Sequence, residues 1–344
     1  MSSGNAHGQP STELLENQFQ PVYEMEMAAP VRRKRPWVLA LILFLLTVLS
    51  TLAVGAQFAQ AYAANLAPFT SDINPFDGIV AAFVHPSLLL LGIPFAFALL
   101  AILLAHELGH YFACRYYGID ASYPYFIPAP TIIGTMGAFI RIRSRIINRT
   151  ALFDVGISGP VVGFLLAVPA LALAIVYSKV VPGAQSDALI VFGNPLLVKL
   201  LIAILRPGVS PNDLLLHPVG RAAWVGLFAT ALNLLPAGQL DGGHIVYSLA
   251  SEKHRRISLA VVTVLFLLGG PALLHTMLNI SMPPVLIEEW PGWAFWAVLL
   301  LVFGFRHSPL LDRWQPLDQK RRVWAFVALV VFMLCFTPMP FFIR

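Results

Sequence analysis

Charged residues and cysteines are scarce in this 344-residue chain, and each scarcity excludes a class of protein. Charged residues make up 11% of the sequence, against about 25% in a soluble globular domain. The 2 cysteines, Cys114 and Cys335, lie in apolar segments and form no C-x-x-C pair. A disulfide framework is therefore not expected, and we interpret Cys114 as a packing residue rather than a metal ligand.

What the chain has in abundance is apolar sequence: 58% of its residues are hydrophobic. The composition predicts an all-α polytopic membrane protein with about six to seven transmembrane helices. The apolar runs are residues 36–56, 88–117, 154–177, 221–249, 257–275, 293–305 and 323–342. The run 293–305 is short for a span, and residues 196–205 are too short to cross, so we interpret the latter as an interfacial helix.

Basic residues cluster in alternate connections between these runs. Lys and Arg follow the second, fourth and sixth runs, whereas residues 57–87 and 276–292 contain neither. Because basic loops remain in the cytoplasm, the pattern predicts a multi-pass protein of the cell membrane with a cytoplasmic N-terminus. The net charge of +5 is then a topology signal rather than an indication of nucleic-acid binding.

Three ionisable residues fall within five positions of the second run, in the pattern His106-Glu107-Leu108-Gly109-His110. Residues four apart share one face of a helix, so both imidazoles can bind one metal ion. Glu107 lies beside them, where it can take a proton from water. Ionisable residues in membrane helices are rare without a function. We therefore favour metal-dependent hydrolysis at or within the membrane over polar contacts between helices.

A catalytic zinc ion has three protein ligands and an open position, so the two histidines need a partner. The fourth run holds the other concentrated polar stretch, residues 233–244, whose prolines and glycines predict a break in the helix. Irregular backbone at membrane depth is tolerated where it is buried or lines a wet cavity. We predict one zinc ion per chain, bound by His106, His110 and Asp241, and rank His244 below Asp241 as a ligand.

The two motifs together resemble those of the site-2 protease family of intramembrane metalloproteases, in its branch of plastid and cyanobacterial members without a PDZ domain. The motifs are His106-Glu107-x-x-His110 and Asn233-x-x-Pro236-x-x-x-Leu240-Asp241-Gly242, supported by residues 134–142 and by Gly156-x-x-Gly159-Pro160-x-x-Gly163. Many members have a proline directly after the asparagine, where this chain has Leu234.

The resemblance implies a role for each residue of these motifs. It implies that His106, His110 and Asp241 bind zinc and that Glu107 activates the water. It also implies that Asn233 holds the substrate or the developing oxyanion.

Residues 118–150, between the second and third runs, include an alternating stretch at 138–143 that predicts a short β-strand or hairpin. An exposed strand edge there can hold an unwound substrate segment, which makes Gly137, Phe139 and Ile140 candidate substrate-binding residues. The alternative is an interfacial loop whose arginines only set topology.

Three glycines of the third run, Gly156, Gly159 and Gly163, lie at helical spacings and leave one helix face without bulk. We interpret them as sites of close helix packing rather than as catalytic residues. Packing against the helix that carries the two histidines would serve both roles.

These observations predict an intramembrane zinc metalloprotease that cleaves membrane-anchored proteins near the cytoplasmic leaflet. Its parts are a polar, disordered cytoplasmic tail (1–35), a first helix with an external loop (36–87), a catalytic core (88–250) and C-terminal helices (251–344). One alternative is a non-enzymatic membrane protein whose structural zinc has His244 as a fourth ligand. The other is a transporter that uses the polar residues as an ion path.

Overall fold

The computed structural model describes residues 36–69, 80–81, 84–183, 188–279, 290–303, 310 and 316–343. The chain divides into two units at Pro36, and the larger unit is Trp37–Arg344. The predicted N-terminal tail, residues 1–35, lies outside the described residues.

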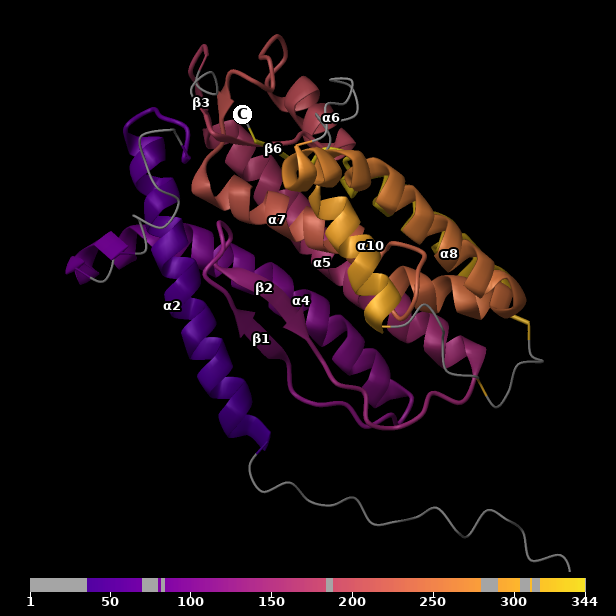
Figure 1. Ribbon diagram of the computed structural model, residues 1–344. Coiled ribbons are helices and arrows are strands. Elements are labelled where there is room, and N and C mark those ends of the chain that lie inside the picture. Colours follow the sequence, from indigo (N-terminus) through magenta and orange to yellow (C-terminus); the bar gives the residue numbers. More distant parts are fainter. Residues whose placement is uncertain are drawn as a thin grey trace, which may run out of the picture. The chain divides into compact units, whose positions relative to one another are not determined.

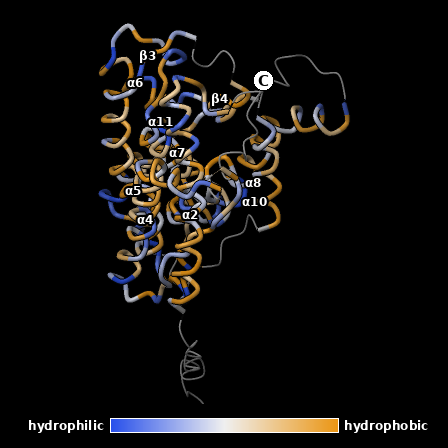
Figure 2. The backbone as a smooth tube through the Cα atoms, turned by 90° about the vertical axis from the view of Figure 1, so that its left-hand side faces the viewer, coloured by the Kyte–Doolittle hydropathy of each residue, from blue (hydrophilic) through white to orange (hydrophobic). Residues whose placement is uncertain are grey.

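Helices dominate the described part of the chain (Figure 1). They are α2 (Pro36–Ala63), the 3-10 helix η2 (Pro86–Gly92), α4 (Ile93–Tyr116), α5 (Arg149–Tyr177), α6 (Leu196–Leu205), α7 (Pro218–Asn233), α8 (Asp241–Leu278), α10 (Gly292–Phe303) and α11 (Gln319–Cys335). Hydrophobic residues predominate along these helices (Figure 2). The short helix predicted at residues 196–205 is confirmed as α6.

Among the described residues, 4 helical segments are long and apolar enough to cross a membrane: Trp37–Ala63, Pro86–Tyr116, Arg149–Tyr177 and Asp241–Leu278. The predicted count of six to seven is thus not confirmed. The last two runs form helices of 12 and 17 residues, α10 and α11, which are short for a bilayer core of about 30 Å.

The break predicted within residues 233–244 is confirmed: α7 ends at Asn233, and a new helix starts at Asp241. The boundary that follows differs from the prediction. The expected connection before residue 257 is instead a kink at Ala250 (φ −147°, ψ 67°), through which α8 continues. The basic residues after Ala250 are compatible with a helix, so their charge alone did not mark a loop.

The centre of the unit is built around α4 and α5. These two helices pack along each other, both pack against α7, and α5 also packs against α8. Helix α7 is buried over most of its surface, with Trp224 and Leu227 among the fully buried side chains. Three polar residues of α4, His106, Glu107 and His110, are buried in this packing.

In space, a β-hairpin lies between α2 and α4 (Figure 1). In the sequence it belongs to the connection between α4 and α5, where a hairpin was predicted. Strand β1 (Tyr125–Pro128) pairs antiparallel with β2 (Thr135–Phe139). The predicted alternation at 138–143 belongs only in part to β2, although Ile142 forms an isolated bridge with Ala121. The hydroxyl of Ser50 in α2 donates a 2.6 Å hydrogen bond to the carbonyl oxygen of Gly134 at the hairpin turn. This bond ties the hairpin to the first span.

Two further sheets of two strands lie near α6. Strand β3 (Lys179–Val180) pairs with β5 (Leu214–Leu215), and β4 (Ile190–Phe192) pairs with β6 (Phe341–Ile343). The last strand corrects the predicted helix 323–342, because α11 ends at Cys335. Pro338 and Pro340 follow that end, and proline removes the backbone donor that a continuing helix needs.

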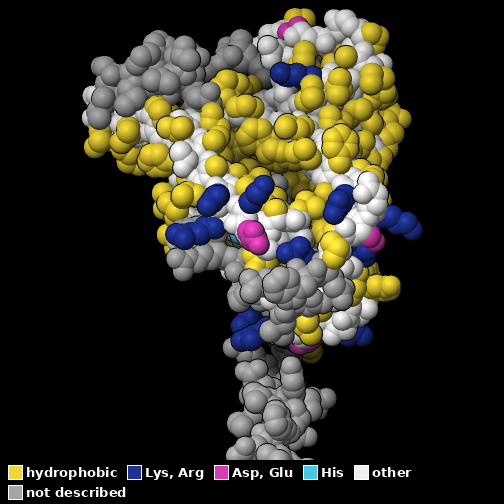
Figure 3. Space-filling view, turned by 90° about the vertical axis from the view of Figure 1, so that its right-hand side faces the viewer, with side chains coloured by type: hydrophobic (Ala, Val, Ile, Leu, Met, Phe, Trp, Pro, Cys, Tyr) yellow, Lys and Arg dark blue, Asp and Glu magenta, His cyan; other side chains and the backbone are white. Residues whose placement is uncertain are grey.

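Hydrophobic and basic side chains occupy different parts of the surface of this unit. Figure 3 shows hydrophobic side chains gathered over one part of the face in view and a band of Lys and Arg side chains below them. The exposed hydrophobic side chains of the long helices include Leu39, Phe97, Leu165 and Leu267. Contiguous apolar surface of this kind is typical of contact with lipid.

Candidate metal centre

Helix α4 brings the two predicted histidine ligands together in the interior. His106 and His110 are one turn apart on the same face, with 5% and 7% of their surface exposed. Their Nε2 atoms lie 3.1 Å apart. The Nε2 atoms of both imidazoles therefore lie close enough together to bind one metal ion.

Asp241 completes the group from the first turn of α8. Its Oδ2 atom lies 3.3 Å from Nε2 of His106 and 3.3 Å from Nε2 of His110. The break between α7 and α8 places it there, and two glycines permit the tight path. A Cβ on Gly242 would lie 2.1 Å from the carbonyl oxygen of Leu234, and a Cβ on Gly243 would lie 2.5 Å from that of Gly238.

The three atoms fit a divalent ion. Zinc bonds nitrogen at about 2.0–2.1 Å and oxygen at about 2.0–2.2 Å, so tetrahedral ligands lie about 3.3–3.5 Å apart, close to the separations above. The other ring nitrogen of His110, Nδ1, lies 2.7 Å from the carbonyl oxygen of Val155. Because Nδ1 donates its proton to that carbonyl, the lone pair of Nε2 is directed into the group.

Among the described residues, the group of metal-type ligands consists of His106, His110 and Asp241, whose ligand atoms all lie within 4.8 Å of one another. His244, the alternative ligand, is not in the group. Its Cβ instead lies against α5, 2.8 Å from where a Cβ on Gly156 would be. Among the described residues, the number of ligands in this group is the number that the protein supplies in catalytic zinc sites.

The glycines of α5 make room for the histidines. A Cβ on Gly159 would lie 2.1 Å from Nε2 of His110, and one on Gly163 would lie 3.2 Å from Nδ1 of His106. In return, a Cβ on Gly109 of α4 would lie 2.6 Å from the carbonyl oxygen of Ser158. The close packing that the glycine spacing predicts therefore occurs, and it occurs against the ligands themselves.

The two other predicted polar residues adjoin the group. Glu107 is buried, with 5% of its surface exposed, and the backbone N–H of Ile140 lies near its carboxylate. The side-chain nitrogen of Asn233, the last residue of α7, lies 3.1 Å from Nε2 of His106. The structure thus brings Glu107 and Asn233 to the same place from different helices.

The three candidate substrate-binding residues lie within β2 or just beyond it. The backbone N–H of Ile140 lies near the carboxylate of Glu107. Phe139 is 46% exposed, and its ring lies 5.6 Å from that of Tyr125 across the hairpin. Gly137 has φ +100°, a conformation that favours glycine, and a Cβ there would meet nothing within 4 Å.

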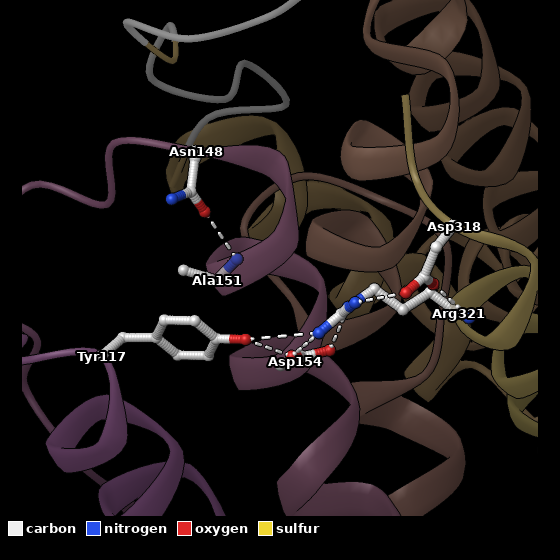
Figure 4. Close-up of polar contacts among 6 residues, drawn as sticks. All are labelled: Tyr117, Asn148, Ala151, Asp154, Asp318 and Arg321. Carbon is white, nitrogen blue, oxygen red and sulfur yellow. Dashed lines mark hydrogen bonds and ion pairs between the residues drawn. The ribbon is translucent and has the colours of Figure 1, made fainter. Parts of the chain in front are cut away.

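A polar cluster that the motifs did not indicate lies one residue from Val155 (Figure 4). Arg321, in the first turn of α11, makes a bidentate pair with Asp154 of α5, with bonds of 2.8 and 2.6 Å. The hydroxyl of Tyr117 also donates to Asp154. Burial and the neighbouring carboxylate raise the pKa of Tyr117 to about 12, so its hydroxyl stays protonated at neutral pH. An acidic residue inside an apolar run was the available signal for this cluster.

Comparison with known proteins agrees with this geometry. The chain is 32% identical to the probable zinc metalloprotease EGY1, chloroplastic, of Arabidopsis thaliana, over 68% of this chain and 44% of that protein. It is 30% identical to the probable zinc metalloprotease EGY2, chloroplastic, of Oryza sativa subsp. japonica, over 73% of this chain and 48% of the relative. For the EGY2 protein of Arabidopsis thaliana the identity is 29%, over 98% of this chain and 60% of the relative.

The chain therefore spans about half the length of the curated relatives it matches. Their names place them in chloroplasts, which gives no support to the predicted cell membrane. Residues 94–276 match the model of Peptidase family M50. These residues include His106, Glu107, His110, Asn233 and Asp241. The chain belongs to Peptidase family M50.

Proposed function

We propose that the chain is a zinc-dependent endopeptidase that hydrolyses peptide bonds of membrane-spanning proteins. The observation that carries the proposal is the meeting of His106, His110 and Asp241 within 4.8 Å inside apolar helices, with Glu107 buried beside them. We propose one zinc ion per chain, held by these three residues. When bound, zinc would lower the pKa of water and polarise the scissile carbonyl.

Glu107 is the proposed general base. Its carboxylate accepts the proton of the attacking water and passes it to the leaving nitrogen. The backbone N–H of Ile140 lies near the carboxylate and favours its ionised form, the form that a base needs. Its burial keeps bulk water away, so each interaction with the reacting atoms is stronger than it would be in solvent.

Asn233 is the proposed partner of the developing oxyanion or of the substrate backbone. Its amide nitrogen carries two N–H donors and lies beside His106, 3.1 Å from Nε2. Donors fixed in place before the reaction stabilise charge that appears in the transition state. Because Asn233 ends α7 at the break in the helix, its side chain reaches the centre without obstructing it.

The hairpin is the proposed holder of the substrate. A membrane helix hides its peptide bonds in its own hydrogen bonds, so the substrate must be extended at the point of cleavage. Addition of an extended segment to a strand satisfies the backbone groups that unwinding exposes. The segment at Gly137, Phe139 and Ile140 is suited to this, because Ile140 also contacts Glu107.

We also propose that the N-terminus and the basic loops lie on the cytoplasmic side of the membrane. The band of Lys and Arg side chains in Figure 3 supports this orientation, since basic loops are retained on that side. The substrates are then membrane-anchored proteins that are cleaved near that leaflet. A cysteine-accessibility experiment at the exposed positions Lys253, Arg255 and Arg256 of α8 tests the orientation, and labelling from the opposite side would contradict it.

The decisive experiment uses Glu107→Gln in the detergent-purified chain. The substitution keeps the size of the side chain and removes the base, so cleavage of membrane-helix substrates is expected to fall by about 10²–10⁴-fold, while zinc content stays at that of the wild type. Glu252→Gln, an exposed glutamate of α8, is the matched control and should retain full activity. Turnover by Glu107→Gln at the wild-type rate would overturn the assignment.

A further inference from the structure

Arg221 is a buried cation without an anionic partner in the described part of the chain. It lies in the first turn of α7 and is 8% exposed. Its guanidinium carbon lies 5.5 Å from the ring centroid of Phe58 and 5.2 Å from that of Phe192. None of the ion pairs or side-chain hydrogen bonds of the described residues involves its guanidinium.

Burial of this unpaired charge destabilises the folded protein when no ligand is bound. A buried charge loses its hydration, and the loss is offset only when the charge is paired and hydrogen-bonded. Two aromatic faces offset part of it, but they accept none of the five N–H donors of arginine in a strong bond. An arginine used only to set topology would extend its head group into water, which Arg221 does not do.

The side chain of Arg221 lines a small cavity. This cavity has a volume of about 40 Å³, and its other walls include Phe192, Asn194, Val198 and Trp224. A water molecule occupies about 30 Å³ in the liquid, so the space suits a group of only a few atoms. A second, more open cavity of about 580 Å³ shares the walls Phe192 and Asn194 and carries Lys199.

The cavity is separate from the metal centre. Arg221 and Asn233 are 12 residues apart on one helix (233 − 221), which corresponds to about 18 Å at 1.5 Å per residue. A ligand bound at Arg221 therefore does not touch the zinc ligands, and this inference goes beyond the proposed peptidase activity.

We propose that Arg221 binds the carboxylate of a small apolar carboxylic acid. The guanidinium presents paired donors whose spacing matches the two oxygens of a carboxylate. The walls beside it are aromatic and aliphatic, which suits an acid with an apolar body. The acid group lies in the small cavity at Arg221, which is the inner cavity. The apolar body extends along Phe192 into the second, more open cavity, which is the outer cavity.

The test measures binding of 3-phenylpropionate to the detergent-purified full chain by isothermal titration calorimetry. The neutral amide of the same shape, 3-phenylpropanamide, corrects for partition into the micelle. We expect the acid to bind and the amide not to bind. Arg221→Gln should weaken binding of the acid by at least about tenfold, the loss expected for a charge-assisted bidentate bond. Arg322→Gln removes an exposed cation of α11 and should leave binding unchanged.

Several outcomes would overturn the proposal, and two of them need only the wild-type chain. Equal heats for acid and amide would mean that the cavity does not recognise charge, and tighter binding of phenyl phosphate would assign it to phosphates. Asp187 precedes Ala188 of the cavity wall and lies outside the described residues. If the acid binds only to Asp187→Asn, then Asp187 is the partner of Arg221 and no external ligand is required.

Discussion

Gly159 of α5 lies directly against the imidazole of His110: a Cβ at Gly159 would come within 2.1 Å of Nε2, the atom that faces Asp241. The position therefore couples helix packing to ligand placement. An added methyl group cannot be accommodated by rotation of the imidazole alone, because Nδ1 is held by the carbonyl oxygen of Val155.

Gly159→Ala should therefore lower zinc affinity, by about 10–100-fold or more, as do changes that misplace a ligand. Zinc content after dialysis against a graded series of chelator measures the effect. Gly270→Ala is the control, because it adds the same methyl to α8, where the nearest neighbour, a ring atom of Phe266, is 3.4 Å away. Wild-type affinity in Gly159→Ala would show that α5 can move away without cost.

Zinc should be bound by three side chains and not by four. His106→Ala and Asp241→Ala are each expected to abolish the binding of about one zinc per chain, whereas His244→Ala should retain it, because His244 is not in the ligand group. Metal analysis of the purified variants decides this. Loss of zinc in His244→Ala with retention in Asp241→Ala would transfer the third position to His244.

Removal of the metal should also lower stability. A ligand that binds only the folded state stabilises it by about 4 kcal/mol when its concentration is a thousand times its Kd. The midpoint of thermal unfolding should thus fall on addition of a chelator and recover with zinc. In Asp241→Ala the chelator should have no effect, and an equal fall in that variant would mean that the metal acts elsewhere.

Gly137→Ala tests the role of the hairpin separately from the metal. At φ +100° with open space around it, an added Cβ causes backbone strain of about 1–2 kcal/mol but no collision. We expect kcat/KM for membrane-helix substrates to fall while zinc content is unchanged. Gly118→Ala is the matched control, because Gly118 has φ +67° and no neighbour within 4 Å and lies outside the hairpin. An equal fall in both variants would indicate strain rather than substrate binding.

Arg321→Gln should loosen the attachment of α11 to α5. The pair with Asp154 is bidentate, and the two side chains are 25% and 28% exposed, so its loss should cost about 1–2 kcal/mol of unfolding free energy, somewhat more than a surface pair. Denaturant unfolding measures this. Because Arg321→Gln removes the partner of Asp154, the double variant with Asp154→Asn should be less destabilised than the sum of the single variants. Additive effects would show that the pair contributes nothing.

The grouping of His106, His110 and Asp241 could be predicted because the signals were local. His106 and His110 are fixed relative to each other by helical periodicity alone. The interruption before Asp241 follows from the prolines and glycines in the segment, whose backbone effects need no knowledge of neighbouring helices. The glycine spacing in α5 likewise indicated a packed face, although not that the packed face carries the ligands.

The structure differs from the predictions where contacts between segments that are distant in the sequence determine it. Nothing near residues 190–192 indicates that β6 will pair with them, and the pair of Asp154 with Arg321 joins residues 167 positions apart. The contact of Ile140 with Glu107 is also made by a backbone group, which leaves no trace in residue type. At Ala250 hydropathy gave two separate runs, and the backbone joined them through a kink rather than a loop.

The pairing of β4 with β6 has a consequence for the order in which the molecule is assembled. Ile190 pairs with Ile343, so β4 has no strand partner until α7, α8, α10 and α11 have been synthesised and inserted. Because Phe192 of β4 and Phe342 of β6 also line the outer cavity, that cavity is completed after the zinc ligands are all in place. Long-range strand pairing is slow compared with helix packing. The candidate metal centre is therefore expected to form earlier than the region around Arg221.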